Sequence, residues 1–193
     1  LDNFSTLTML DIIRENKPEL MLLHLTGYDT ACHEHGVGSK EAGEALDELD
    51  RHLGELLAVI GTNTTVVIFS DHSQLNVNRC FDPNTLLDEF GYAKRNEDGS
   101  LRDARAFFLN ADGNAILFNR NLNDEELAQV EARLDAEKVV ERKLTDAEMT
   151  IAGFIPGRID TLAEKATLNG KIVAGYAAKP GVYFSADPTH KAT

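Results

Sequence analysis

A ten-residue stretch, GYDTACHEHG at residues 27–36, holds two carboxylates, two imidazoles and a thiol. Asp29 and His33 are four residues apart, a spacing that lets a loop or a first helical turn aim both side chains at one point. Zinc accepts carboxylate oxygen and imidazole nitrogen, and a catalytic zinc ion takes three protein ligands and keeps one position open. His35 is a candidate for the third ligand, for a supporting group or for a solvent-facing residue, and the thiol of Cys32 is a further zinc donor. An exposed polar loop is the alternative interpretation.

A second cluster, in the sequence SDHS, sets Asp71 directly beside His72. Adjacent side chains on an extended strand point to opposite faces, so both reach one ion only where the strand ends and the backbone turns. The polar residues that follow, Ser73, Gln74 and Asn76, suit such an ending. A polar loop that begins with an aspartate cap is the alternative here.

Both clusters follow segments with the composition of strands. ELMLLHL at residues 19–25 is a nearly unbroken apolar run, and TVVIFS at 65–70 is rich in β-branched residues. Between them, apolar residues recur at spacings of three and four over residues 39–60, which predicts an amphipathic helix with Ser39 as its N-cap. This order predicts a parallel βαβ unit. Both clusters then fall at the carboxyl edge of the sheet, where open α/β folds bind ligands.

In this order and at this separation, the two clusters resemble the motifs of the type I phosphodiesterase and nucleotide pyrophosphatase family, part of the alkaline phosphatase superfamily. Asp29, His33 and Gly36 match the family's Asp-x-x-Gly-His-x-x-Gly-Pro loop, and SDHS matches its Ser-Asp-His-Gly motif. Three neighbours depart from the family's glycine, proline and glycine: Cys32, Val37 and Ser73. Because none of these three is a ligand in the family, the departures bear on substrate range and loop conformation more than on metal binding.

The resemblance implies an α/β fold, part of an alkaline-phosphatase-like parallel sheet core with a small α/β insert lobe. It implies two divalent metal ions, zinc or alternatively manganese, of which Asp29 and His33 bind one and Asp71 and His72 bind the other. It also implies an enzyme, a phosphoric diester hydrolase or nucleotide pyrophosphatase, that acts on phosphodiester or pyrophosphate bonds of a small-molecule or nucleotide substrate.

Some parts of the family's site are not visible in this sequence. The family takes a further aspartate and a nucleophilic threonine or serine from its N-terminal half, and residues 1–28 show neither. We therefore expect a C-terminal fragment that lacks the catalytic nucleophile and is inactive alone. The third ligand of the first metal is a histidine in a Thr-His-Gly motif. His190 follows a threonine but precedes Lys191, so the ligand is either His190 or a residue beyond Thr193.

Three regions are expected along the chain: a metal-binding α/β core segment over residues 1–80, a small α/β insert lobe over 81–180, and a return to the core over 181–193. KIVAGYAAKPGVYFS at 171–185 is expected to rejoin the main sheet. The lobe contains a hairpin signal and two capping boxes: Asp112-Gly113, Asn123 with Glu126, and Thr145 with Glu148.

Composition limits the classes of partner. The chain has 193 residues, 42% of them hydrophobic, which is enough for one core with a smaller lobe. A formal net charge of -13 argues against a nucleic-acid partner and is compatible with cation binding. No apolar run approaches the ~20 residues of a membrane span. The presence of two cysteines does not distinguish a cytoplasmic protein from a secreted one.

Two other functions remain as alternatives. One is a metal-dependent phosphomutase or phosphomonoesterase of the same superfamily, which also uses paired metals and Asp-His motifs. The other is a non-catalytic binding module that keeps the fold. Arg102 and Arg105, beside Asp103, face either a substrate phosphate or solvent at a strand edge.

Overall fold

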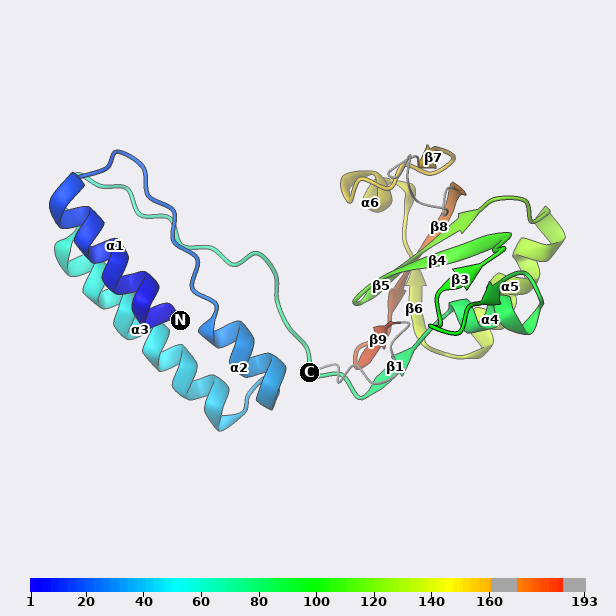
Figure 1. The fold of residues 1–193 in the computed structure, drawn as a ribbon, viewed down its shortest axis with the longest axis horizontal. Helices are drawn as coiled ribbons and strands as arrows, with labels where there is room; N and C mark the ends of the chain where they lie inside the picture. The colour runs from blue at the N-terminus through cyan, green and yellow to red at the C-terminus, as the bar shows by residue number, and fades with distance from the viewer. Residues whose placement is uncertain (161–169, 186–193) are drawn as a thin grey trace. The chain divides into compact units, whose positions relative to one another are not determined.

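The computed structural model describes residues 1–160 and 170–185 and divides into two compact units. The first unit covers Leu1–Asn76, and the second begins at Val77. Figure 1 shows helices alone in the first unit and a sheet with helices in the second.

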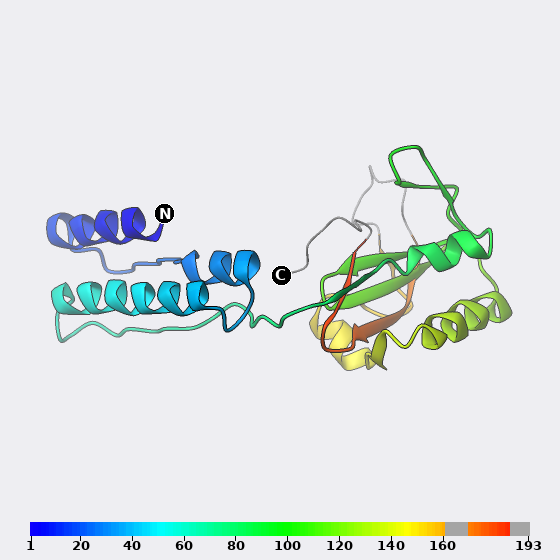
Figure 2. The ribbon, with the colours of Figure 1, turned by 90° about the horizontal axis from the view of Figure 1, so that it is seen from below.

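Three helices form the first unit: α1 (Asp2–Asn16), α2 (Gly27–His35) and α3 (Lys40–Val59). Both α1 and α2 pack on α3 (Figures 1 and 2). The helix predicted over residues 39–60 is confirmed as α3, and the Ser39 hydroxyl caps it by accepting a hydrogen bond from the backbone N–H of Ala42 at 3.1 Å.

The strands predicted at residues 19–25 and 65–70 are wrong for this structure, and so is the parallel βαβ unit built from them. Both segments are irregular. Several side chains that were expected to be buried stand in solvent, with Leu22 81% exposed and Phe69 80% exposed. A strand exists only when another strand satisfies its backbone N–H and C=O groups, and the described part of the first unit contains no strand that could serve.

The second unit is built on a mixed set of strands. Its main sheet has the order β4-β5-β8-β6, with β7 also paired to β8, and all of these pairs are antiparallel. The bounds are β4 (Ala106–Ala111), β5 (Asn114–Asn119), β6 (Val140–Lys143), β7 (Ile159–Asp160) and β8 (Gly170–Ala178). Two small pairs complete the unit: β1 (Arg79–Phe81) runs parallel to β9 (Val182–Phe184), and β2 (Lys94–Arg95) runs antiparallel to β3 (Leu101–Arg102).

Helices cover both faces of this main sheet. α4 (Asn84–Glu89) and α5 (Asp124–Ala136) bury Leu87 and Leu134 against a core that includes Phe108 of β4 and Leu117 of β5. The opposite face carries α6 (Asp146–Ile151), whose Met149 packs on Phe107, Ile116 and Phe118. Alternate strand residues thus supply two separate apolar clusters, as the pleat of a sheet requires.

The local signals of the second unit are confirmed. Asp112 and Gly113 form the two-residue turn between β4 and β5. Each predicted capping box is present, one at the start of α5 and one at the start of α6. One prediction in this region is wrong: most of residues 171–185 does not rejoin a main parallel sheet, because β8 lies inside the antiparallel sheet of the second unit.

Candidate metal centre

The helix α2 brings the first candidate ligands together. Asp29 and His33 are one helical turn apart, and Nε2 of His33 lies 3.5 Å from Oδ1 of Asp29. Both side chains are about half exposed, at 43% and 55%, so a cation can approach them from solvent. The predicted proximity of these two side chains is therefore present, on a nine-residue helix that ends at Gly36 with φ 91°.

The two remaining candidates on α2 face other partners. Nε2 of His35 lies 3.7 Å from a carboxylate oxygen of its neighbour Glu34. Cys32 is buried, with 1% of its surface exposed, and a hydrogen bond to the Cys32 thiol raises the pKa of the Tyr28 hydroxyl above its usual value of 10.0. A metal role for His35 or Cys32 stays a prediction.

The second candidate pair lies in the irregular segment that follows residue 70. Nε2 of His72 is 3.6 Å from Oδ2 of Asp71, and the backbone N–H of His72 donates to Oδ1 of Asp71 at 3.0 Å. The backbone therefore turns here, so that two adjacent side chains approach each other instead of pointing to opposite faces. Both are exposed.

Two amide side chains join the second segment to α2. Nε2 of Gln74 donates a hydrogen bond to Oδ1 of Asp29 across 45 residues of sequence. Asn76 bonds to the backbone of Val37, donating from Nδ2 and accepting at Oδ1. These pairings were not predicted from the sequence, because no local pattern specifies a contact between residues so far apart.

The carboxylate of Asp2 fixes the other end of α2. Its oxygens accept hydrogen bonds from the backbone N–H groups of Thr26 at 3.0 Å and Gly27 at 2.7 Å. An anion at this position satisfies N–H groups that have no partner within the helix and interacts favourably with its dipole. The residue thus attaches α1 to the helix that carries Asp29 and His33.

The donor chemistry suits divalent metals, but the described residues hold only parts of a site. Each pair supplies one carboxylate and one imidazole, the donors that zinc prefers. Within residues 1–160 and 170–185, no three side chains of His, Cys, Asp or Glu converge into a metal-binding group. His190 and Thr193, named above for the third ligand, lie outside the described residues. Each pair therefore supplies two ligands to a metal ion, and each ion needs further donors.

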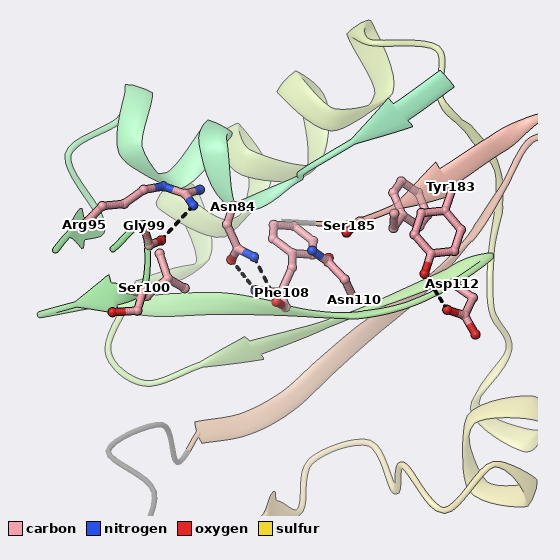
Figure 3. A pocket seen from close by; sticks show the side chains of 11 residues that line it. Asn84, Arg95, Gly99, Ser100, Phe108, Asn110, Asp112, Tyr183 and Ser185 are labelled. Atoms are coloured by element: carbon pink, nitrogen blue, oxygen red, sulfur yellow. Dashed lines mark hydrogen bonds between the residues drawn. The ribbon is translucent and has the colours of Figure 1, made fainter. Parts of the chain in front are cut away.

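A separate cavity of about 360 Å³ lies in the second unit, beside α4 and β4 (Figure 3). Arg95 on its wall is held by Asp82 at 2.7 Å, by Asp88 at 2.5 Å and by the carbonyl of Gly99. Burial lowers the pKa of Arg95, but these carboxylate contacts outweigh it and raise the pKa overall. Its charge is therefore already balanced within the protein.

The two arginines considered as phosphate ligands also have acidic neighbours. Arg105 forms two hydrogen bonds to Glu126, at 2.8 and 2.7 Å, and its guanidinium lies over the ring of Tyr92. Nε of Arg102 is 3.6 Å from a carboxylate oxygen of Asp103. Arg105, the residue before β4, therefore connects the start of this strand to α5, and this arrangement favours a structural role for it.

A family profile described as type I phosphodiesterase / nucleotide pyrophosphatase matches residues 1–192. No curated protein sequence matches significantly. Among the described residues, no helix has the length and apolar character needed to cross a membrane.

Two solved structures resemble the chain, both of phosphonoacetate hydrolase from Sinorhizobium meliloti 1021. In the complex with phosphonoacetate, the TM-score is 0.65 at 18% identity, over 97% of this chain and 43% of the hydrolase. In the complex with phosphonoformate, the TM-score is 0.65 at 19% identity, over 99% of this chain and 44% of the hydrolase. The chain therefore spans less than half the length of that enzyme and shares the fold of the matching part.

Proposed function

Because this chain belongs to the type I phosphodiesterase / nucleotide pyrophosphatase family, we propose that it supplies metal ligands to an enzyme that hydrolyses phosphodiester or pyrophosphate bonds. The α/β fold, part of an alkaline-phosphatase-like core with an insert lobe, agrees with the family. The proposed cofactors are two divalent ions, zinc or alternatively manganese.

One observation carries this proposal: the segment after Asp71 and His72 is bonded to the helix that bears Asp29 and His33. The bond from Gln74 to Asp29 makes that connection directly. Two carboxylate-imidazole pairs that are distant in sequence thus belong to one packed region, as a site with two metals requires.

Charge explains how this acidic chain would attract an anionic substrate. We assign Asp29 and His33 to one ion and Asp71 and His72 to the other. Each pair, with the carboxylate ionised and the imidazole neutral, carries a charge of -1 and leaves a bound divalent ion with a net positive charge. When bound, such ions polarise phosphoryl oxygens and lower the pKa of a hydroxyl nucleophile.

The nucleophile is proposed to come from a part of the enzyme outside this chain. The chain covers 43% of a hydrolase with the same fold, so more than half of such an enzyme lies outside the matched part. The irregular apolar segments 19–25 and 65–70 support this proposal, because they have strand composition and lack strand neighbours. The chain alone is then expected to bind metal weakly and not to turn over substrate.

Zinc titration by calorimetry tests the assignment of ligands. The His33→Ala and Asp71→Asn variants should each weaken zinc binding at least about tenfold, because each removes a donor. His24→Ala and Asp47→Asn are matched controls on exposed residues of the same unit and should bind as the unchanged chain does. Equal binding by all five proteins would contradict the proposed metal site.

An activity assay tests the position of the nucleophile. The isolated chain, loaded with zinc, should not hydrolyse bis(p-nitrophenyl) phosphate, and measurable turnover by pure protein would contradict our placement of the nucleophile elsewhere. In the full-length protein, faster cleavage of p-nitrophenyl phosphate than of the diester would favour a phosphomonoesterase, and absence of both metal affinity and activity would favour a binding module.

A further inference from the structure

Gln74 makes a direct side-chain contact between the two candidate metal segments. Its amide nitrogen donates to Oδ1 of Asp29, and the side chain is partly buried at that point. The residue follows His72 by two positions, so it belongs to the second segment by sequence and to the first by contact.

The spacing and acceptor capacity at Asp29 are compatible with a bound cation. Two ligands of a tetrahedral zinc ion lie ~3.3 Å apart when each bond is ~2.0 Å long. The separation of 3.5 Å between Asp29 Oδ1 and His33 Nε2 is close to this value. An ionised carboxylate has about four lone-pair sites, so Asp29 can accept a hydrogen bond from Gln74 and still bind a metal ion.

The orientation of the Gln74 amide is fixed by its neighbour. If the amide were turned over, its oxygen would face the oxygen of the Asp29 carboxylate, and two acceptors would meet. In the observed orientation Oε1 of Gln74 is buried and has no hydrogen-bond partner among residues 1–160 and 170–185. Burying an acceptor without a partner costs free energy. The hydrogen bond to Asp29 therefore forms in an orientation that leaves the amide oxygen of Gln74 unsatisfied.

We propose that Gln74 is a positioning residue that orients Asp29 for metal binding and leaves its buried amide oxygen beside the same site. This inference rests on the proposed function, because it needs Asp29 and His33 to bind a metal ion. Outer-shell hydrogen bonds to ligating carboxylates commonly contribute 10- to 100-fold to metal affinity, so an effect of about that size is expected here.

Calorimetric titration with zinc tests this role in the full chain. Gln74→Met keeps the length of the side chain and removes both the donor and the acceptor, and it should weaken zinc binding about 10- to 100-fold. The chain has one other glutamine, Gln129, whose amide oxygen accepts from the Tyr92 hydroxyl in the second unit. Gln129→Met is therefore the matched control and should leave zinc affinity unchanged.

Cobalt in place of zinc gives a readout that a merely structural role would not change. The visible absorption of bound Co²⁺ depends on its coordination geometry, so Gln74→Met should alter this spectrum at saturating metal. Circular dichroism checks that the variant is folded. If Gln74→Met does not fold, Gln74→Asn takes its place. Asparagine keeps the amide but is one methylene too short to reach Asp29, so it should show the same loss of zinc affinity.

The outcomes separate this inference from the proposed function. If His33→Ala weakens binding while Gln74→Met binds zinc and cobalt as the unchanged chain does, the metal site stands and the role of Gln74 is wrong. If His33→Ala has no effect, both proposals are overturned. Weaker binding and an altered cobalt spectrum in Gln74→Met, with Gln129→Met unchanged, support the positioning role.

Discussion

The side chain of Asn76 pairs with the backbone of Val37 in the way that a neighbouring strand would. The N–H of Val37 donates to Asn76 Oδ1 at 2.7 Å, and Asn76 Nδ2 donates to the carbonyl of Val37 at 3.0 Å. The adjacent Gly36 has φ 91°, and a Cβ placed there would lie 3.1 Å from Asn76 Oδ1. One amide therefore fixes the turn that ends the helix of the first candidate pair.

Asn76→Ala should destabilise the chain by about 1 kcal/mol, because it removes two hydrogen bonds at an exposed site where water can replace them. Urea unfolding followed by circular dichroism measures this change. Asn63→Ala, in an exposed turn of the same unit, serves as the control and should change the midpoint little.

Asn84 makes the same pair of bonds inside the second unit and should be more important. It accepts from the N–H of Phe108 at 2.8 Å and donates to the carbonyl of Phe108 at 3.0 Å, with only 4% of its surface exposed (Figure 3). Asn84→Ala leaves both backbone groups buried without partners, so a loss of about 2–3 kcal/mol is expected in urea unfolding. A smaller loss than for Asn76→Ala would show that water enters this site.

Gly27→Ala should loosen the attachment of α1 to α2. A Cβ at Gly27 would lie 2.7 Å from Oδ2 of Asp2, too close for the present contact to survive. We expect a loss of about 1–2 kcal/mol in thermal unfolding, comparable to the loss of a helix cap. In an Asp2→Ala background the same substitution should cost much less, because the clashing atom is gone, and additive losses would contradict this explanation.

Gly43→Ala is a matched control for that experiment. This glycine lies inside α3, and a Cβ there meets nothing within 4 Å. The substitution should stabilise the helix by about 0.5–1 kcal/mol, because alanine has less backbone freedom to lose.

Glu148 should make the second unit sensitive to acid. Two hydrogen bonds from Arg142, together with those from Thr145, lower the pKa of Glu148 from 4.5 to about 2. Because the folded pKa lies below the unfolded value, this stabilisation is fully present above pH 4.5 and is lost as the pH falls towards 2. Thermal unfolding of Glu148→Gln should therefore depend less on pH over this window than that of the unchanged chain.

Glu125→Gln, in the first turn of α5, is the control for this measurement. It removes a carboxylate at a similar helical position that, within the described part of the chain, forms no ion pair with arginine. If both variants flatten the pH profile equally, the specific contact with Arg142 is not the cause.

Local signals in the sequence were sufficient for some elements and not for others. α3 was predictable because its leucine spacing and the Ser39 cap act within one helix, and the Asp112-Gly113 turn was predictable because its conformation is chosen by two residues. α1 was not predicted. Its apolar side chains surround the helix instead of forming one stripe, with Leu10 buried but Phe4 and Leu7 exposed.

The strand predictions failed for a different reason. Apolar composition at residues 19–25 and 65–70 indicates a preference, but a strand exists only when another strand satisfies its backbone groups. The candidate site likewise combines a feature set by local sequence with one set by packing between distant segments. The proximity of Asp29 and His33 follows from helical spacing, whereas the bond from Gln74 to Asp29 depends on how distant segments pack.

The irregular backbone of residues 19–25 and 65–70 also determines which backbone amides exchange their hydrogens with solvent most rapidly. Amides outside regular structure exchange with deuterium far faster than those in paired strands. β8, which has β5 on one side and β6 and β7 on the other, should retain its protons longest. The two segments flanking the candidate metal ligands should lose theirs first, so deuterium uptake followed by mass spectrometry would report directly when those segments acquire strand partners.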